Sequence, residues 1–365
     1  MAKLISSLGL MSGTSLDGID VAHIRTDGRN IVERLGGLSI PYSPSQREAL
    51  RAGLEAAQNL TDRTARPPIL AALEADLTRW HAEAVSRFIR EFNPGPIDYL
   101  GFHGQTILHR PEQRLTVQLG DGQMLAQLTG LPVIADMRAA DVAAGGQGAP
   151  LVPAYHAALA ADLAANPCAF VNIGGVANIT YIGSDGSLLA FDTGPGNALL
   201  DDWAFKHTGQ AVDLNGALAS QGQVDEARLA QFLRDDYFTK TPPKSLDRNH
   251  FAGLDMAGLS PADGAASLTA FTAQSIAKAR DYCPQMPFMW VITGGGRRNL
   301  TLMSMLRKAI PAMVVTAEEA GLNGDLMEAE AWAYLAVRAH LGLPLSFPGT
   351  TGVREALTGG LRFLS

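Results

Sequence analysis

The sequence predicts an α/β protein of two domains with mostly parallel or mixed sheets. The main observation is that three glycine-rich turns each follow a short apolar segment typical of a strand. These turns are residues 13–18, 192–197 and 293–299, after the apolar segments 8–11, 188–191 and 288–292. Glycine lets backbone N–H groups approach an anion closely, and such turns bind phosphate. Three of them, far apart in the chain, indicate one phosphate-rich ligand held between two halves of the protein.

The two halves open with the same pattern. Residues 7–34 are typical of three strands joined by the first glycine turn and by Asp27-Gly28. Residues 169–191 repeat the pattern, with Gly174-Gly175 and Asp185-Gly186 as turns. Asp-Gly between apolar segments is a strong hairpin signal, so each half is predicted to begin with a three-stranded meander. Because such hairpins are common, a chance similarity is the alternative.

Helices are predicted between and after the meanders. Residues 44–92 are mostly helical, and 80, 84, 85, 88 and 89 form one apolar face. A buried strand then runs into His103-Gly104-Gln105-Thr106. That strand covers residues 97–102. Further elements are a helix over 123–128, a strand over 131–135, a loop over 136–153, and helices over 197–207, 265–282 and 325–339. The last helix carries an Asp325-x-x-Glu328 capping box, and the alternation of strands with helices predicts the α/β class.

Composition excludes several classes of protein. The 365 residues exceed one typical domain, and 47% hydrophobic with 18% charged residues describes an ordinary globular chain. The net charge of -7 argues against a general nucleic-acid surface. Cys168 and Cys283 lie far apart without metal-ligand spacing, so we expect free, buried thiols. Neither a signal peptide nor a membrane-length apolar segment is evident, which predicts a cytoplasmic protein without membrane contact.

Two common nucleotide-binding motifs are absent from the sequence. There is no Gly-Lys dipeptide and hence no Walker A loop. No Gly-x-Gly-x-x-Gly follows an early strand, which argues against a dinucleotide-binding enzyme.

A further set of motifs resembles the 1,6-anhydro-N-acetylmuramic acid kinase family of the actin–hexokinase–Hsp70 superfamily. The matching segments are residues 9–18 (GLMSGTSLDG), 103–106 (HGQT), 145–153 (GGQGAPLVP), 172–175 (NIGG), 191–197 (FDTGPGN), 323–325 (NGD) and 328–329 (EA). Together they are far more specific than any single glycine turn, and the resemblance runs from about residue 9 to the C-terminal helix.

The resemblance implies two RNase H-like domains with mixed five-stranded sheets and a nucleotide cleft between them. Residues 1–165 would form the first domain, to which residues from about 345 to 365 return, and residues 166–344 the second. The implied activity is an ATP- and Mg²⁺-dependent opening of 1,6-anhydro-N-acetylmuramic acid with phosphorylation of O6. The products would be N-acetylmuramic acid 6-phosphate and ADP, in peptidoglycan recycling. A homodimer is implied by the family alone.

The resemblance also implies the nucleotide-binding residues. The first glycine turn would hold the β- and γ-phosphates, and the third turn would lie against adenosine. The residues are Ser12, Gly13, Thr14, Ser15, Leu16, Asp17, Gly18 and Ile19, then Gly194, Pro195 and Gly196, then Gly294, Gly295, Gly296 and Asn299. An ordinary hairpin and a plain strand-to-helix turn are the alternatives for the first and third turns. Met11 replaces the aspartate that many related sugar kinases carry for Mg²⁺, so the metal contacts stay open, with Asp17 and Asp192 as candidates.

Asp192 is the expected general base, since it ends a strand at the second glycine turn and the resemblance assigns that role here. A turn-forming aspartate is the alternative. His103 and Gln105 are candidates for contacting the sugar or its lactyl carboxylate, or else they are structural. Arg138 suits that carboxylate because its guanidinium is planar, or else it forms a surface ion pair. Glu328 would orient Asp192 or the water, or only cap its helix. The role of the loop over 145–150 stays open.

Two other functions fit the same fold. One is a kinase for another small molecule, against which Met11 and the 103–106 motif argue. The other is a non-catalytic ATP switch of the actin or Hsp70 kind, which would need a polymer contact or a peptide-binding domain that the sequence does not indicate.

Overall fold

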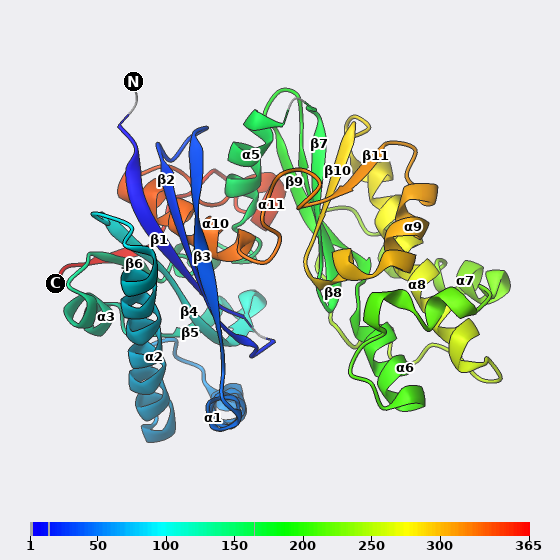
Figure 1. The fold of residues 1–365 in the computed structure, drawn as a ribbon, viewed down its shortest axis with the longest axis horizontal. Helices are drawn as coiled ribbons and strands as arrows, with labels where there is room; N and C mark the ends of the chain where they lie inside the picture. The colour runs from blue at the N-terminus through cyan, green and yellow to red at the C-terminus, as the bar shows by residue number, and fades with distance from the viewer. Residues whose placement is uncertain (1–2, 14, 164) are drawn as a thin grey trace. The chain divides into compact units, whose positions relative to one another are not determined.

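The computed structural model describes residues 3–13, 15–163 and 165–365. The chain forms two compact units, which are coloured by residue number in Figure 1. The first unit consists of Met1–Ala161 and Leu326–Ser365, and the second of Asp162–Asp325. In the described part of the chain, no helix has both the length and the apolar character that a membrane span needs.

The first unit is built on a seven-stranded mixed sheet in the order β12-β6-β4-β1-β2-β3, with β5 paired to β4. β1, β2 and β3 form an antiparallel meander, and β4 and β6 run parallel to β1. The strands are β1 (Ile5–Ser12), β2 (Gly18–Thr26), β3 (Val32–Pro41), β4 (Tyr99–Arg110), β5 (Leu115–Leu119), β6 (Val133–Ala135) and β12 (Leu361–Phe363). The prediction of five strands is wrong for this sheet, because a hairpin strand and the C-terminal segment extend it.

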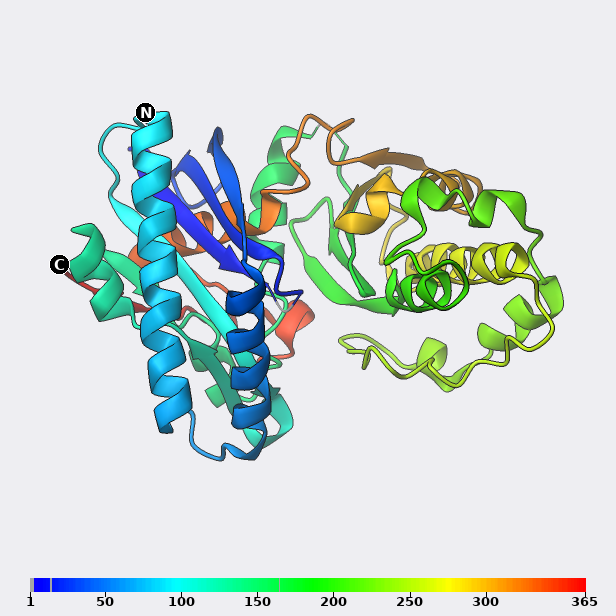
Figure 2. The same cartoon turned by 60° about the horizontal axis from the view of Figure 1, so that its bottom comes forward.

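Two long helices of the first unit pack against its sheet. Among the described residues, the α-helices of the first unit are α1 (Pro44–Ala56), α2 (Pro68–Phe92), α3 (Gly122–Thr129), α4 (Ala139–Ala143), α5 (Pro153–Asp162), α10 (Met327–His340) and α11 (Pro348–Thr351). α2 lies along the sheet beside α1, as Figure 2 shows, and its apolar face shares a core with Leu8 and Leu10 of β1. The apolar face predicted from residue 80 to 89 is largely confirmed, since Ala84, Val85 and Phe88 are buried.

α10 approaches the sheet unusually closely at two glycines. Gly9 of β1 and Gly101 of β4 are register partners. A Cβ atom on Gly9 would lie 1.8 Å from the carbonyl oxygen of Ala329, and one on Gly101 would lie 2.1 Å from that of Trp332. Because both positions lack a side chain, the backbone of α10 rests directly on the sheet.

This packing places α10 in the first unit. The chain returns there at Leu326, whereas the sequence led us to expect the return at about 345. The predicted capping box is also wrong: α10 begins at Met327 without a side-chain cap, and Asp325 instead accepts hydrogen bonds from Arg297 and Arg298. A short apolar element at a unit boundary gives no local signal for the sheet on which it will pack.

The second unit repeats the strand order of the first. Its five-stranded sheet has the order β11-β10-β7-β8-β9, with an antiparallel meander of β7 to β9 and with β10 and β11 parallel to β7. The strands are β7 (Cys168–Ile173), β8 (Val176–Ile182), β9 (Leu188–Pro195), β10 (Met289–Thr293) and β11 (Met313–Thr316). The helices are α6 (Ala198–Thr208), α7 (Glu226–Phe232), α8 (Pro261–Lys278) and α9 (Leu300–Ala309). The predicted α/β class with two mixed sheets and a repeated meander is confirmed.

α8 is the central helix of the second unit. Its buried residues Ala273, Ile276 and Ala277 share a core with β7, β8 and β10, and α9 packs beside it (Figure 1). Cys168 is buried in β7 and Cys283 is half-buried after α8, and both thiols are free.

Candidate active site

The first glycine turn connects β1 to β2 in the first unit. Ser15 and Asp17 are exposed, whereas the side chains of Leu16 and Ile19 are buried in the apolar core. Thr14, which the resemblance includes among the phosphate-binding residues, lies outside the described residues. Leu16 and Ile19 therefore have only backbone groups to offer a ligand.

Ser12 also turns its side chain inward. Its Oγ lies 2.7 Å from the Tyr42 hydroxyl and donates to Gln105 Oε1 at 2.5 Å. Gln105 is fully buried, and its Nε2 donates to the carbonyl of Gly13 at 3.2 Å. His103 is buried as well, with Nδ1 3.2 Å from the carbonyl of Ser12. The two residues expected to contact the sugar thus contact the first glycine turn.

Arg138 lies next to His103. Its Nε and Nη2 groups lie 3.3 and 3.2 Å from His103 Nε2, and its guanidinium lies over the ring of Trp332 at 4.9 Å. Burial lowers the pKa of Arg138 to about 10, and the carboxyl groups of Glu328 and Asp141 oppose that change. A planar cation held by a ring and an imidazole is a preorganised partner for a carboxylate.

Glu328 stands on α10, one turn before Trp332. Desolvation by the surrounding protein raises the pKa of its carboxyl, and the charge of Asp20 adds to this rise. The charge of Arg138 opposes the rise. Part of the Glu328 residue is nevertheless exposed to solvent. Because the predicted capping box does not form, capping does not explain Glu328, and its carboxyl instead balances the charge of Arg138.

The loop over 145–150, whose role the sequence left open, supports Arg138. Buried Asp141 accepts hydrogen bonds from the N–H of Gly148 at 2.6 Å and from Thr351 Oγ1 at 2.6 Å. The carbonyl of Gly148 in turn accepts from Arg138 Nη1 at 2.7 Å. The carboxylate of Asp141 thus holds the main chain at Gly148, and the carbonyl of Gly148 holds one edge of the guanidinium.

Asp192 lies near the end of β9 in the second unit, beside a register shift in the β8–β9 pair. Its Oδ2 accepts the N–H of Leu246 at 2.8 Å, its N–H donates to the carbonyl of Lys244 at 3.0 Å, and its carbonyl accepts the Tyr237 hydroxyl at 2.5 Å. Burial raises the pKa of Asp192 to about 6, and the bond from Leu246 partly opposes this rise. A fixed carboxylate with a pKa close to neutrality suits a general base.

The pKa of Asp192 sets an expected pH profile. Since a base works only when it is ionised, kcat/KM is expected to fall about tenfold per pH unit as the pH drops below about 6. The measurement is initial rate against pH with saturating ATP, and a profile that stays flat down to pH 4.5 would contradict the assignment. Unfolding monitored at each pH separates this effect from acid denaturation.

The third glycine turn begins with Gly294, whose φ of +70° suits glycine. A Cβ there would lie 2.4 Å from Asn172 Oδ1. Asn299 caps α9 by accepting the N–H of Leu302 at 2.9 Å. Beside this turn lies a cavity of about 350 Å³ in the second unit. Its lining includes Asn197, Asp201, Leu214, Gly295, Arg298 and Asn299. The apolar side chains of Leu200, Val212 and Leu214 together with the polar groups of this lining suit a nucleoside.

Other residues of the expected nucleotide site are less accessible. Gly194, Pro195, Gly196 and Gly296 are buried, whereas Gly295 is exposed at the cavity. A Cβ on Gly196 would lie 2.2 Å from the carbonyl of Gly174, so this glycine lets the second turn pack against the β7–β8 turn.

Known proteins match this chain over nearly its whole length. A family model described as anhydro-N-acetylmuramic acid kinase matches residues 5–364. The chain belongs to the anhydro-N-acetylmuramic acid kinase family. Relatives with that name include one from Rhodopseudomonas palustris (strain ATCC BAA-98 / CGA009), 54% identical over 98% of this chain and 99% of the relative. Others are from Bradyrhizobium diazoefficiens, 52% identical over 98% and 99%, and Brucella suis, 49% identical over 99% of each chain.

Solved structures resemble the chain more distantly. Component A of (R)-2-hydroxyglutaryl-CoA dehydratase from Acidaminococcus fermentans has a TM-score of 0.48 at 12% identity, covering 92% of this chain and 98% of that one. A ROK family glucokinase from Streptomyces griseus, in complex with glucose and AMPPNP, has a TM-score of 0.41 at 14% identity, covering 91% and 99%. Membership of the anhydro-N-acetylmuramic acid kinase family thus rests on sequence, and it makes the chain a phosphotransferase.

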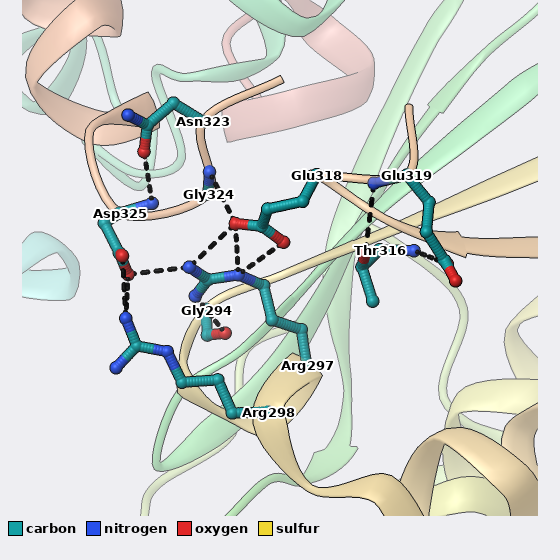
Figure 3. Close-up of polar contacts among 9 residues, drawn as sticks. All are labelled: Gly294, Arg297, Arg298, Thr316, Glu318, Glu319, Asn323, Gly324 and Asp325. Atoms are coloured by element: carbon teal, nitrogen blue, oxygen red, sulfur yellow. Dashed lines mark hydrogen bonds and ion pairs between the residues drawn. The ribbon is translucent and has the colours of Figure 1, made fainter. Parts of the chain in front are cut away.

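In this member of the anhydro-N-acetylmuramic acid kinase family, an ion-pair network fixes the third glycine turn (Figure 3). The buried side chain of Arg297 donates to Glu318 at 3.0 Å, to Asp325 at 2.7 Å and to the carbonyl of Gly294 at 2.9 Å. Arg298 reaches the same Asp325 at 2.7 Å. One guanidinium therefore joins the start of the turn to the segment that leads into α10.

Replacing Arg297 with methionine is expected to destabilise the second unit by about 1–3 kcal/mol, because several charge-assisted hydrogen bonds are lost at once. The expected loss of stability is modest because Glu318 and Asp325 are half exposed, so water can solvate their carboxylates once Arg297 is replaced. Thermal unfolding measures the effect. The matched control is Arg298→Met, whose side chain is 66% exposed and should change stability by less than about 0.5 kcal/mol. Equal effects of the two substitutions would contradict the network's role.

Several residues of the site were not identified from the sequence. Lys244, Leu246 and Tyr237 surround Asp192, and Lys244 Nζ lies over the ring of Tyr282 at 4.4 Å. Pro242-Pro243 indicates a loop, but nothing in the sequence indicates that this loop lies against Asp192. Arg297 stands directly after the glycines, and Asp141 and Trp332 carried no motif that pointed to the site.

Proposed function

We propose that this chain uses ATP and water to open 1,6-anhydro-N-acetylmuramic acid and to phosphorylate its O6, giving N-acetylmuramic acid 6-phosphate and ADP. Family membership supports the substrate and the reaction class. The observation that carries the chemistry is Asp192, a fixed carboxylate near the C-terminal end of β9 with a pKa raised to about 6.

The substrate's chemistry determines what the base must do. O6 carries no proton, because it is bonded to C1 as an ether. Asp192 would therefore take a proton from a water whose oxygen bonds to C1 while the C1–O6 bond breaks. O6 would bond to the γ-phosphorus as the bond from phosphorus to the ADP oxygen breaks. The balance is one sugar, one water and one ATP to one phosphorylated sugar and ADP, with one proton released.

The glycine turns would supply electrostatic stabilisation, which is most of the task in phosphoryl transfer. Backbone N–H groups of the first glycine turn would hold the β- and γ-phosphates, and the cavity beside Gly295 and Asn299 would hold adenosine. Among the described residues of the first turn, Ser15 and Asp17 have exposed side chains.

Mg²⁺ would shield phosphate charge when bound. Among the described residues, no three histidine, cysteine, aspartate or glutamate side chains cluster as a metal site. This donor set fits a cation held mainly by nucleotide oxygens and water, as is usual for Mg²⁺, with Asp17 and Asp192 as candidates for contact through water.

Arg138 would bind the lactyl carboxylate of the sugar. Its guanidinium is oriented by Gly148, His103 and Trp332 before any ligand binds, which lowers the ordering cost of a bidentate contact. Glu328 lies near enough to balance its charge and is a candidate for contacting the sugar. We further expect a cytoplasmic enzyme of peptidoglycan recycling, active as a homodimer.

The test is a reaction in ¹⁸O-labelled water with Mg-ATP and 1,6-anhydro-N-acetylmuramic acid, read by mass spectrometry. One labelled oxygen at C1 of a phosphorylated product is expected, after subtraction of exchange in a control that contains only product. A phosphorylated product without label at C1 would overturn the role of water. Transfer to hexoses but not to this sugar would favour a kinase for another small molecule, and slow ATP hydrolysis indifferent to every sugar would favour an ATP switch.

A further inference from the structure

His103 and Gln105 lie in the middle of β4, beside the first glycine turn. Gln105 is the register partner of Ser12 across the parallel β1–β4 pair. Gln105 is fully buried and His103 is 7% exposed. Both side chains direct hydrogen-bonding groups at main-chain carbonyls of the turn, His103 at Ser12 and Gln105 at Gly13.

The neighbours of His103 determine which of its nitrogens carries the proton. Arg138 contacts Nε2 through two groups, Nε and Nη2, and both are only donors. Nε2 must therefore accept, and the proton of the neutral ring sits on Nδ1, from which it points to the carbonyl of Ser12. Burial and the charge of Arg138 keep the pKa of His103 well below its ordinary value, which agrees with a neutral ring. Both nitrogens are thus engaged, and neither is left for a sugar hydroxyl.

The orientation of Gln105 follows in the same way. Its Nε2 faces two carbonyl oxygens, those of Gly13 and Thr106, which only accept. Oε1 therefore faces Ser12 Oγ and accepts its proton, and the Tyr42 hydroxyl in turn donates to Ser12 Oγ. The chain of bonds from Tyr42 through Ser12 to Gln105 fixes the amide, and the amide fixes the carbonyl of Gly13.

Fixed carbonyls have a consequence for the phosphate ligand. In a trans peptide the C=O and the N–H point to opposite sides. When His103 holds the carbonyl of Ser12 inward, the N–H of Gly13 in the same peptide unit is directed outward. An anion site made of backbone N–H groups depends on such orientation, because donors already aimed at the charge need no reorganisation.

We propose that His103 and Gln105 are positioning residues, which orient the N–H groups of the first glycine turn toward the nucleotide phosphates. Neither residue contacts the sugar. The inference rests on the proposed function of that turn in ATP binding. It gives a role in nucleotide affinity to two residues for which the sequence left open sugar contact or a structural role.

The test uses two substitutions that separate the ring nitrogens of His103. The amide nitrogen of asparagine reproduces the position of Nδ1, whereas the glutamine amide reaches the position of Nε2. His103→Gln should raise KM for ATP about five- to tenfold, the loss of roughly one hydrogen bond, with KM for the sugar within about twofold of wild type. His103→Asn should keep KM for ATP within about threefold, because it can still donate to Ser12.

The matched control is His81→Asn. His81 is another fully buried histidine of the first unit, but its Nδ1 bonds to the carbonyl of Leu77 and its ring packs on Phe102. It should lose stability without a change in KM for ATP, which separates positioning from general loosening of the core. If His103→Gln does not fold, Gln105→Glu is the second variant, since it removes the donor to Gly13 and should also raise KM for ATP selectively.

Binding of a non-hydrolysable ATP analogue to the unsubstituted protein keeps the two proposals apart. If that protein does not bind the analogue, the proposed function fails and the positioning roles fail with it. If it binds, equal KM for ATP in wild type and His103→Gln, equal losses in the Gln and Asn variants, or a selective rise in the sugar KM would each overturn the inference alone.

Discussion

Asp192→Asn is expected to lower turnover by about 10²–10⁴-fold, the usual contribution of a general base, while ATP still binds. The amide keeps the size of the side chain but cannot take the proton of the attacking water. The measurements are kcat with the anhydro sugar and the dissociation constant of an ATP analogue. Near-normal turnover would remove Asp192 from the mechanism. Asp185→Asn, in the exposed β8–β9 turn, makes the same change elsewhere in the second unit and should keep turnover within about twofold.

Asp192→Asn should lose activity without losing thermal stability. The pKa of Asp192 in the folded state, about 6, lies above the ordinary value of 3.8. A raised carboxyl pKa means that protonation favours the folded state at low pH, and that this contribution is lost as the pH rises through 6. At pH 7 the ionised carboxylate is therefore a cost to folding, and Asp192→Asn should unfold at the same temperature as wild type or higher. A large loss of stability would mean that lost activity reports unfolding.

Arg138→Gln is expected to raise KM for 1,6-anhydro-N-acetylmuramic acid by about 30- to 1000-fold. The reason is that a buried, charge-assisted hydrogen-bonded pair is worth roughly 2–4 kcal/mol. Glutamine keeps a donor but loses the charge and the planar fork. Because Arg138 also contacts His103, a rise in KM alone would not identify the sugar's carboxylate as its partner.

A second substrate resolves this ambiguity. 1,6-Anhydro-N-acetylglucosamine lacks the lactyl group, so wild type should use it poorly and Arg138→Gln should use both sugars about equally. An unchanged preference between the two sugars would contradict the assignment. Arg79→Gln, on the exposed face of α2 where Arg79 pairs with Asp76, is the matched control and should keep the wild-type preference.

Much of the architecture was predictable because its signals are local. Asp27-Gly28 and Asp185-Gly186 close hairpins between strands, and the glycine turns after β1 and β10 stand where the sequence indicated. The second turn was predicted to begin at residue 192, but β9 continues to Pro195. Asp192 became a candidate from local signals as well, since it stands between an apolar segment and the glycines that follow it.

The remaining features depend on residues that meet only in three dimensions. Nothing near Asp192 indicates that Lys244 and Leu246 will fold over it. The sequence predicted that this strand ends at residue 102, but β4 continues to Arg110. Nothing local to His103 and Gln105 indicates that their side chains will contact Ser12 and Gly13. The expected return of the chain at about 345 differs from Leu326 because the fit of α10 on β1 and β4 requires glycines far from it in sequence.

That fit has a consequence for how the protein tolerates change. Gly9 and Gly101 contact the main chain of α10 at Ala329 and Trp332, and the same helix carries Glu328. Even the single methyl group of an alanine at either glycine would push the whole helix outward, and with it the groups that face Arg138. Random mutagenesis under selection for sugar recycling should therefore mark two glycines in the middle of a sheet as indispensable, although neither has a side chain with which to take part in the reaction.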